Sequence, residues 1–212
     1  MSCWPLLPRF RFLVASILLA AVGCNPFHRA PKLPERVDLI AIMPVEPLER
    51  TSATPVVPAE HLGSGAAREV TVAVYGALTS SSEWRAVPDL TVAQALAHMK
   101  GEGDLASRAR ALGKEVGADA ALFGTVSRYV ERVGATYGAQ HPASVAFTLS
   151  LISVASGKIL WTGSFDQTQK PLTTNLFNWW QFWRGGPRWF TAQEFTRLGV
   201  EHLLRDLAKR AG

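Results

Sequence analysis

Two stretches of the sequence specify most of the fold: GKEVGADAALFGTVSRYVE at residues 113–131 and VAFTLSLISVASGKILWTGSFDQT at residues 145–168. In the first, Gly117 is placed to end an amphipathic helix, because glycine tolerates the left-handed backbone that often follows a helix. An apolar strand then runs over residues 120–130. In the second, strand-like runs at residues 144–154 and 159–165 flank the tight turn at residues 156–158, and a short loop at 132–141 separates the two stretches. The pattern predicts a helix, a strand and an antiparallel hairpin, in that order.

These stretches resemble a family of bacterial envelope lipoproteins that includes the curli secretion-channel lipoprotein CsgG and the LpoB-like activators of penicillin-binding proteins. The likeness lies in a helix ending in Gly-Ala-Asp at 117–119, a strand of the type LFGTV at 122–126 and a hairpin of the type SGKILW at 156–161. In element order it covers roughly residues 37–168. The resemblance implies an anticodon-binding-domain-like fold and an envelope location. Its motif residues shape turns and strands, so it implies little about activity.

Outward from these stretches, helices and strands alternate before the hairpin. Hydrophobic periodicity and turn residues predict the following elements: a strand at 37–45, a long loop at 46–62, a helix at 66–78, a strand at 84–87, and helices at 92–99 and 104–116, the second of them with Asp104 as its N-cap. Thr191 opens a last helix with Glu194 three residues later, which is the capping-box pattern. The order β-α-β-α-α-β-β-β-α predicts an α/β (α+β) domain with a mixed sheet and helices packed on it.

The N-terminus has the layout of a bacterial lipoprotein signal. Arg9 and Arg11 precede an apolar run at 12–22, which is shorter than the roughly 20 residues that span a bilayer. The run ends in Ala21-Val22-Gly23-Cys24, which resembles the lipobox, with Ala21 where leucine is usual. The resemblance implies cleavage after Gly23 and lipidation of Cys24 by acyl chains such as palmitate. The alternative is a plain cleaved signal peptide with a chance cysteine.

Cleavage would divide the chain into a signal peptide at 1–23, a lipidated, proline-rich tether at 24–36 and a single domain at 37–212. The two cysteines are Cys3 and Cys24, so the domain would hold no thiol, which excludes cysteine catalysis and disulfides there. Residue 25 is asparagine rather than the aspartate that marks retention at the inner membrane in enteric lipoproteins. By that resemblance we expect the cell outer membrane, with the domain facing the periplasm.

Few residue patterns point to catalysis or to a metal. The five histidines show no metal-ligand spacing, and the G-x-G-x-x-A match at 101–106 follows a helical pattern rather than a strand. We therefore expect no enzyme activity, no metal and no cofactor. The formal net charge of +5 falls to +3 when Arg9 and Arg11 leave with the signal, too little scattered charge to favour nucleic acid.

The sharpest feature is an aromatic insertion at residues 170–190. It holds four of the seven tryptophans of the chain, and its candidate interface residues are Trp179, Trp180, Trp183, Arg184, Arg188 and Trp189. Three interpretations stay open. The segment could be a satellite core packed by a long loop, a membrane-interface anchor, since tryptophan and arginine suit the headgroup zone, or a protein interface, where the same residues dominate binding.

These observations together predict a non-enzymatic outer-membrane lipoprotein that acts as a periplasmic adaptor or activator in an envelope complex. Its expected partners are the membrane, through the N-terminal lipid, and other envelope proteins, but not nucleic acid. The alternative is an oligomeric subunit of a secretion or export assembly resembling the curli secretion channel. In that case the chain would form a homo-oligomer.

Overall fold

The computed structural model describes residues 32–48, 65–99, 101–135, 138–169 and 189–211. The helices are α1 (Ala66–Thr79), α2 (Asp89–His98), α3 (Leu105–Glu115) and α5 (Ala192–Ala211). The strands are β1 (Leu39–Ile42), β2 (Glu46–Pro47), β3 (Arg85–Ala86), β4 (Ala120–Val130), β5 (Val133–Ala135), β6 (Gly138–His141), β7 (Ser144–Ser153) and β8 (Ile159–Thr168). The expected mixed sheet with helices packed on it is confirmed.

The main sheet has the strand order β3-β1-β4-β7-β8, with β2 also pairing with β4. Its first half is parallel, since β1 pairs in parallel with both β3 and β4. Its second half is antiparallel, with β7 between β4 and β8. The 11-residue strand β4 is where the two halves meet, which explains why it is apolar along most of its length.

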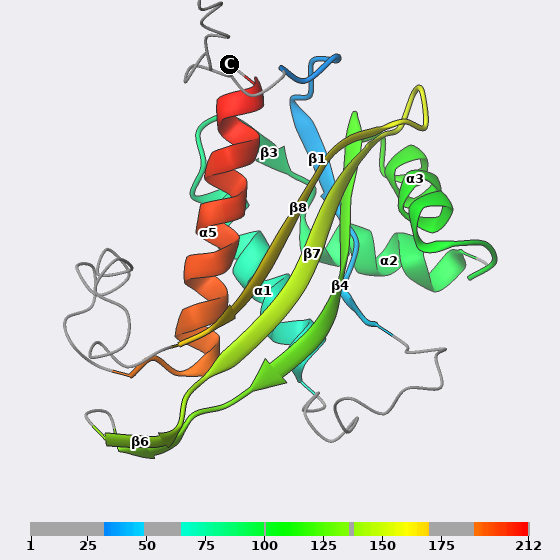
Figure 1. Cartoon of the computed structure of the whole chain (residues 1–212). Coiled ribbons are helices and arrows are strands. Elements are labelled where there is room, and N and C mark those ends of the chain that lie inside the picture. Colours follow the sequence, from blue (N-terminus) through cyan, green and yellow to red (C-terminus); the bar gives the residue numbers. More distant parts are fainter. Residues whose placement is uncertain (1–31, 49–64, 100, 136–137, 170–188, 212) are drawn as a thin grey trace, which may run out of the picture.

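Helices α1 and α5 cover one face of this sheet, and α2 and α3 lie on the other (Figure 1). On α1 the buried residues repeat every fourth position, at Ala66, Val70, Val74 and Leu78. They pack against the inward residues of β4, β7 and β8, together with the buried residues of α5. The largest hydrophobic core therefore lies between the sheet and the α1–α5 layer.

Helices α2 and α3 cover only part of the second face. Their core includes Val92, Leu112, Ala121 and Ile152. Beyond it this face carries hydroxyls, and Thr148 and Thr162 on it are half-buried and exposed, respectively. The two halves of the second face thus differ: one packs helices, and the other presents polar side chains to solvent.

Several local predictions are confirmed. The carboxylate of Asp104 accepts the Ser107 N–H at 3.0 Å and caps α3. Gly117 follows α3 with a φ of +68°, in the left-handed region that favours glycine. The Thr191 hydroxyl accepts the Glu194 N–H at 3.1 Å, while the Glu194 carboxylate accepts the Thr191 N–H at 3.0 Å, which makes a complete capping box.

Three expectations on strands need correction. The predicted strand at 37–45 holds only β1, at 39–42, and the predicted loop at 46–62 begins with a second strand, β2, because the chain leaves the ladder at Pro44 and then pairs again with β4. The loop predicted between β4 and β7 contains the two-stranded sheet β5–β6. Strand β8 continues to Thr168, three residues beyond Phe165, because β7 is long enough to pair with all of it.

Hydrogen bonds hold residues 33–39 against one end of the domain. The Leu33 N–H donates to the Arg210 carbonyl at 2.6 Å, and the Asp119 carboxylate accepts the N–H groups of Asp38 and Leu39 at 3.0 and 2.8 Å. We call residues 33–38 the strap. Its first residue lies beside the C-terminal end of α5, at the end of the molecule opposite the β5–β6 hairpin (Figure 1).

Candidate functional site

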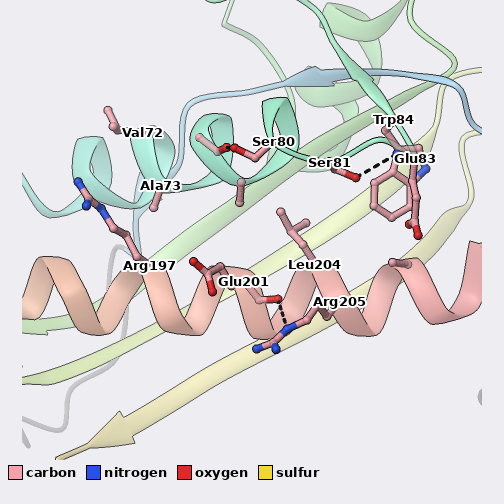
Figure 2. A pocket seen from close by; sticks show the side chains of 13 residues that line it. Val72, Ala73, Ser80, Ser81, Glu83, Trp84, Arg197, Glu201, Leu204 and Arg205 are labelled. Carbon is pink, nitrogen blue, oxygen red and sulfur yellow. Dashed lines mark hydrogen bonds between the residues drawn. The ribbon is translucent and has the colours of Figure 1, made fainter. Parts of the chain in front are cut away.

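A groove of about 600 Å³ lies between α1 and α5. Figure 2 shows its lining: α1 forms one wall, α5 forms the other, and Trp84 stands at one end. Its thirteen lining residues are Val72, Ala73, Gly76, Ala77, Ser80, Ser81, Glu83, Trp84, Arg197, Glu201, Leu204, Arg205 and Ala208. More than half of these lining residues are apolar or small, and the charged ones are Glu83 and three residues of α5.

The α1 wall is made of small side chains. Ala73, Gly76, Ala77 and Ser80 lie beside the buried stripe of the helix and face the groove. A Cβ atom added at Gly76 would meet no heavy atom within 4 Å. A glycine inside a helix costs roughly 0.5–1 kcal/mol relative to alanine, and no close packing within the described residues requires it here. The open space over Gly76 lets another backbone approach α1 closely.

The rim of the groove carries both signs of charge. Arg197, Glu201 and Arg205 lie at four-residue spacing on α5, and Glu83 lies near Trp84. The Arg205 guanidinium donates through Nε to the Glu201 carbonyl at 3.1 Å, which holds its side chain along the helix (Figure 2). A mixed rim of this kind sets the register of a polar partner more than it adds affinity.

A second concavity of about 540 Å³ shares Glu83 and Trp84 with the groove. Its other walls are residues 33–38 of the strap and Ala211. The Glu35 carboxylate accepts a hydrogen bond from the Ser153 hydroxyl. The pKa of Glu35 lies below its usual range, first because of this bond and then because of Ser156. The carboxylate is therefore ionised at neutral pH and ties the strap to the β7–β8 turn.

Other titratable groups show no catalytic arrangement within the described residues. Burial raises the pKa of Tyr75 and of Tyr129 to about 12, so both phenols stay neutral at physiological pH. The Tyr75 hydroxyl donates to the Ile42 carbonyl at 3.4 Å, a structural contact. Among the residues that the structure describes, no group of three or more His, Cys, Asp or Glu side chains could hold a metal ion. No helix in that part of the chain is long and apolar enough to cross a membrane.

The residues proposed from sequence as a site fall mostly outside the described ranges. This holds for Gly23, Cys24, Trp179, Trp180, Trp183, Arg184 and Arg188. Trp189 is described and half-buried. Its neighbour Phe190 is buried in the main core, where its N–H donates to Gln169 and its ring stacks with Phe195 at 6.5 Å between centroids. The C-terminal end of the aromatic insertion is thus part of the core.

The groove itself was not predicted from the sequence. Its walls, α1 and α5, lie more than 100 residues apart in the chain, and a helical pattern does not indicate which helices become neighbours. The available signal was weak: small residues at 73, 76, 77 and 80, beside a regular apolar stripe. Small residues are common on helices, so this pattern alone does not mark a site.

A known family model matches part of the chain. The family model described as "Peptidoglycan-synthase activator LpoB" matches residues 66–166, which run from the start of α1 into β8. The family resemblance seen in the sequence is therefore supported on its LpoB side, and no finding supports its CsgG side. No curated protein matches the chain.

Solved structures with similar chains include a PelC dodecamer from Paraburkholderia phytofirmans, with 13% identity and a TM-score of 0.47, covering 86% of this chain and 94% of that one. The LpoB C-terminal domain from Salmonella enterica has 17% identity and a TM-score of 0.43, covering 65% and 88%. The corresponding domain from Escherichia coli has 18% identity and a TM-score of 0.41, covering 63% and 84%.

Proposed function

We propose that this protein is a lipid-anchored activator of a peptidoglycan synthase, held at the outer membrane and facing the periplasm. The family match over residues 66–166 carries the proposal, because that family is described by this activity. The protein acts by binding the synthase and performs no chemistry of its own. The lipid on Cys24 supplies the membrane anchor.

The α1–α5 groove is the surface that we assign to the synthase. The match begins at Ala66, the first residue of α1, so it includes the small-residue wall of the groove. Val72 on this wall is 54% exposed, which is high for a large aliphatic side chain. The groove thus offers apolar area, space for close backbone approach and a rim with both charges, which are properties of a protein-binding surface.

The direct test is a glycan-polymerisation assay with a purified synthase from the same organism. We expect the mature protein, added in detergent, to raise the polymerisation rate in a saturable way and to bind the synthase with a matching dissociation constant. A rate that stays unchanged, with no binding at micromolar concentrations, would contradict the proposal. An intrinsic polymerising activity without the synthase would contradict the non-enzymatic part.

Filling the groove at Gly76 separates binding from folding. Gly76→Gln adds a side chain into open space and replaces a poor helix former, so stability should rise by about 0.5 kcal/mol. Synthase binding should weaken about tenfold, which corresponds to about 1.4 kcal/mol. Calorimetry and thermal unfolding measure the two effects. Gly76→Ala is the matched control, since it gains the helix propensity with little bulk and should retain binding.

The aromatic insertion supplies a parallel arm of the same test. Replacement of Trp179, Trp180 and Trp183 by alanine should reduce synthase capture if the insertion belongs to the interface. Capture that drops with Gly76→Gln but not with the triple variant assigns the synthase contact to the groove alone. Capture that is insensitive to both changes removes both surfaces from the proposal.

The anchor has its own prediction. Cys24→Ala should move the protein from the membrane fraction to the soluble periplasmic fraction, because the thiol that carries the lipid is gone. Fractionation and immunoblotting measure the distribution. A stable anchor needs more than one acyl chain, and a variant without the Cys24 thiol cannot carry the chains bound there. The release should therefore be nearly complete. A variant that remains fully membrane-bound argues against lipidation as the anchor.

A further inference from the structure

Strand β8 is a long sheet edge. It stands at the end of the order β3-β1-β4-β7-β8, and within the described ranges β7 is its only strand neighbour. The opposite edge strand, β3, has two residues, whereas β8 has ten. An edge strand presents a row of backbone N–H and C=O groups, so a long edge is a template for another strand.

The register shows which backbone groups point outward. The Gln169 N–H donates to the Ala143 carbonyl at 3.0 Å, so these two residues form a hydrogen-bonded pair. In an antiparallel ladder such pairs alternate with non-hydrogen-bonded pairs. Gln167, Phe165, Gly163 and Trp161 therefore bond to β7. The backbone groups of Thr162, Ser164, Asp166 and Thr168 point away from it.

Side-chain contacts support this assignment independently. Opposed side chains lie closer together at non-hydrogen-bonded pairs, where the Cα atoms are about 4.5 Å apart. Hydroxyl–hydroxyl bonds join Thr148 to Ser164 at 3.0 Å and Ser150 to Thr162 at 3.0 Å. A third joins Ser144 to Thr168 at 2.6 Å. All three occur at pairs that the ladder assigns as non-hydrogen-bonded.

This edge has few of the features that usually protect an edge strand. Proline is absent from β8, and Asp166 is its one charged residue. The Asp166 carboxylate is paired with Arg128, on β4. Helix α5 packs on the face of the strand, where Gly199 lies against Phe165 and Leu203 against Gly163. The bulge near Ile159 affects only the first residues, so residues 162–168 form a regular edge.

We propose that β8 pairs with β8 of a second copy of this chain, antiparallel and about a two-fold axis at Phe165. Thr162 of one copy then lies opposite Thr168 of the other, and Ser164 opposite Asp166. All four outward residues of each copy find backbone partners, which gives about eight new hydrogen bonds. The two sheets become one continuous sheet through the dimer.

The chemistry of the edge favours this register and a second copy. Each Asp166 carboxylate faces the Ser164 hydroxyl of the other copy, which can donate to it, while Arg128 neutralises its charge. The half-buried Phe165 rings meet at the axis, where a cross-strand aromatic pair adds roughly 0.5–1.5 kcal/mol. A shift by two residues would place Thr168 opposite Leu160, the bulged residue. The edge is thus complementary to itself.

The test measures the molar mass of residues 24–212 with Cys24→Ser, made without lipid, by light scattering over a range of concentrations. We expect twice the monomer mass at high concentration. Ser164→Pro should give a monomer, because proline removes an outward N–H but no bond to β7. Ser164→Val is the matched control: it loses the same hydroxyl, keeps the N–H and should remain a dimer.

Backbone amide exchange of the unmutated sequence at these positions gives a second readout that does not depend on a foldable proline variant. The amides of Thr162, Ser164 and Asp166 should be protected at high concentration and exchange quickly on dilution. The amides of Gly163 and Phe165 should stay protected throughout, since β7 holds them. A monomer at all concentrations would overturn the proposal, whether the outward amides exchange freely or are protected by another segment of the chain. A dimer that survives Ser164→Pro with its fold intact would overturn it as well.

Discussion

Replacing Gly124 with alanine is expected to destabilise the protein by about 3 kcal/mol, because the added methyl group has no room. A Cβ atom at this position would lie 2.3 Å from the Thr148 carbonyl oxygen and 2.8 Å from the Leu149 side chain. The first contact is with backbone in the middle of the β4–β7 ladder, so it cannot be relieved by rotating a side chain. Chemical denaturation followed by circular dichroism measures the loss.

The control for this change is another glycine to alanine substitution in the same chain. Gly76→Ala meets no atom within 4 Å and should instead raise the free energy of unfolding by roughly 0.5–1 kcal/mol. The two variants make the same chemical change with opposite expected signs. Equal destabilisation of both would show that the close approach of β7 to Gly124 is not what sets the cost.

Replacing Phe147 with alanine is expected to cost about 4 kcal/mol, within the range found for large aromatic side chains in cores. Phe147 is 2% exposed and lies at 5.4 Å from Phe165 between ring centroids. Phe165 in turn meets Phe195 of α5 edge-on at 5.4 Å. The substitution leaves a cavity where the sheet and α5 meet, and it removes one ring of this series. A loss of this size is a large part of the 5–15 kcal/mol typical of a domain.

Thermal and denaturant unfolding of Phe147→Ala check this value, with Val72→Ala as the control. Val72 is 54% exposed on α1, so its truncation should change stability by less than about 0.5 kcal/mol. A cost at Phe147 as small as that at Val72 would mean that the core relaxes to fill the cavity.

Local signals in the sequence were sufficient for elements that carry their own boundaries. Helix α3 begins at an Asp104 cap and ends before Gly117, and both residues act through their own side chain or backbone. Strand β4 matches the predicted range of residues 120–130, because turn residues on both sides of a long apolar run leave few alternative positions for the ends of the strand. The β7–β8 hairpin was predictable for the same reason: its turn and both of its strands are contiguous in the chain.

Features that depend on distant segments were not predictable in this way. Strand β2 is two residues long and exists because β4 extends beyond β1 and offers a free stretch of ladder. The β5–β6 hairpin has a short, largely exposed first strand with no apolar alternation that would mark it. The groove needs α1 and α5 to become neighbours. In each case the determining contact joins residues whose proximity no local pattern encodes.

The strap at residues 33–38 has a mechanical consequence. A pull on the chain upstream of Leu33 first loads the bond to the Arg210 carbonyl and the two bonds to Asp119, and then acts on β1 along its own axis. Because β1 lies between β3 and β4, that force shears the ladders on both of its sides, and their hydrogen bonds share the load instead of opening one after another. If a lipid at Cys24 and a bound synthase pull in opposite directions, the tension enters the domain through β1 and reaches β4, which passes it to the long β4–β7 ladder.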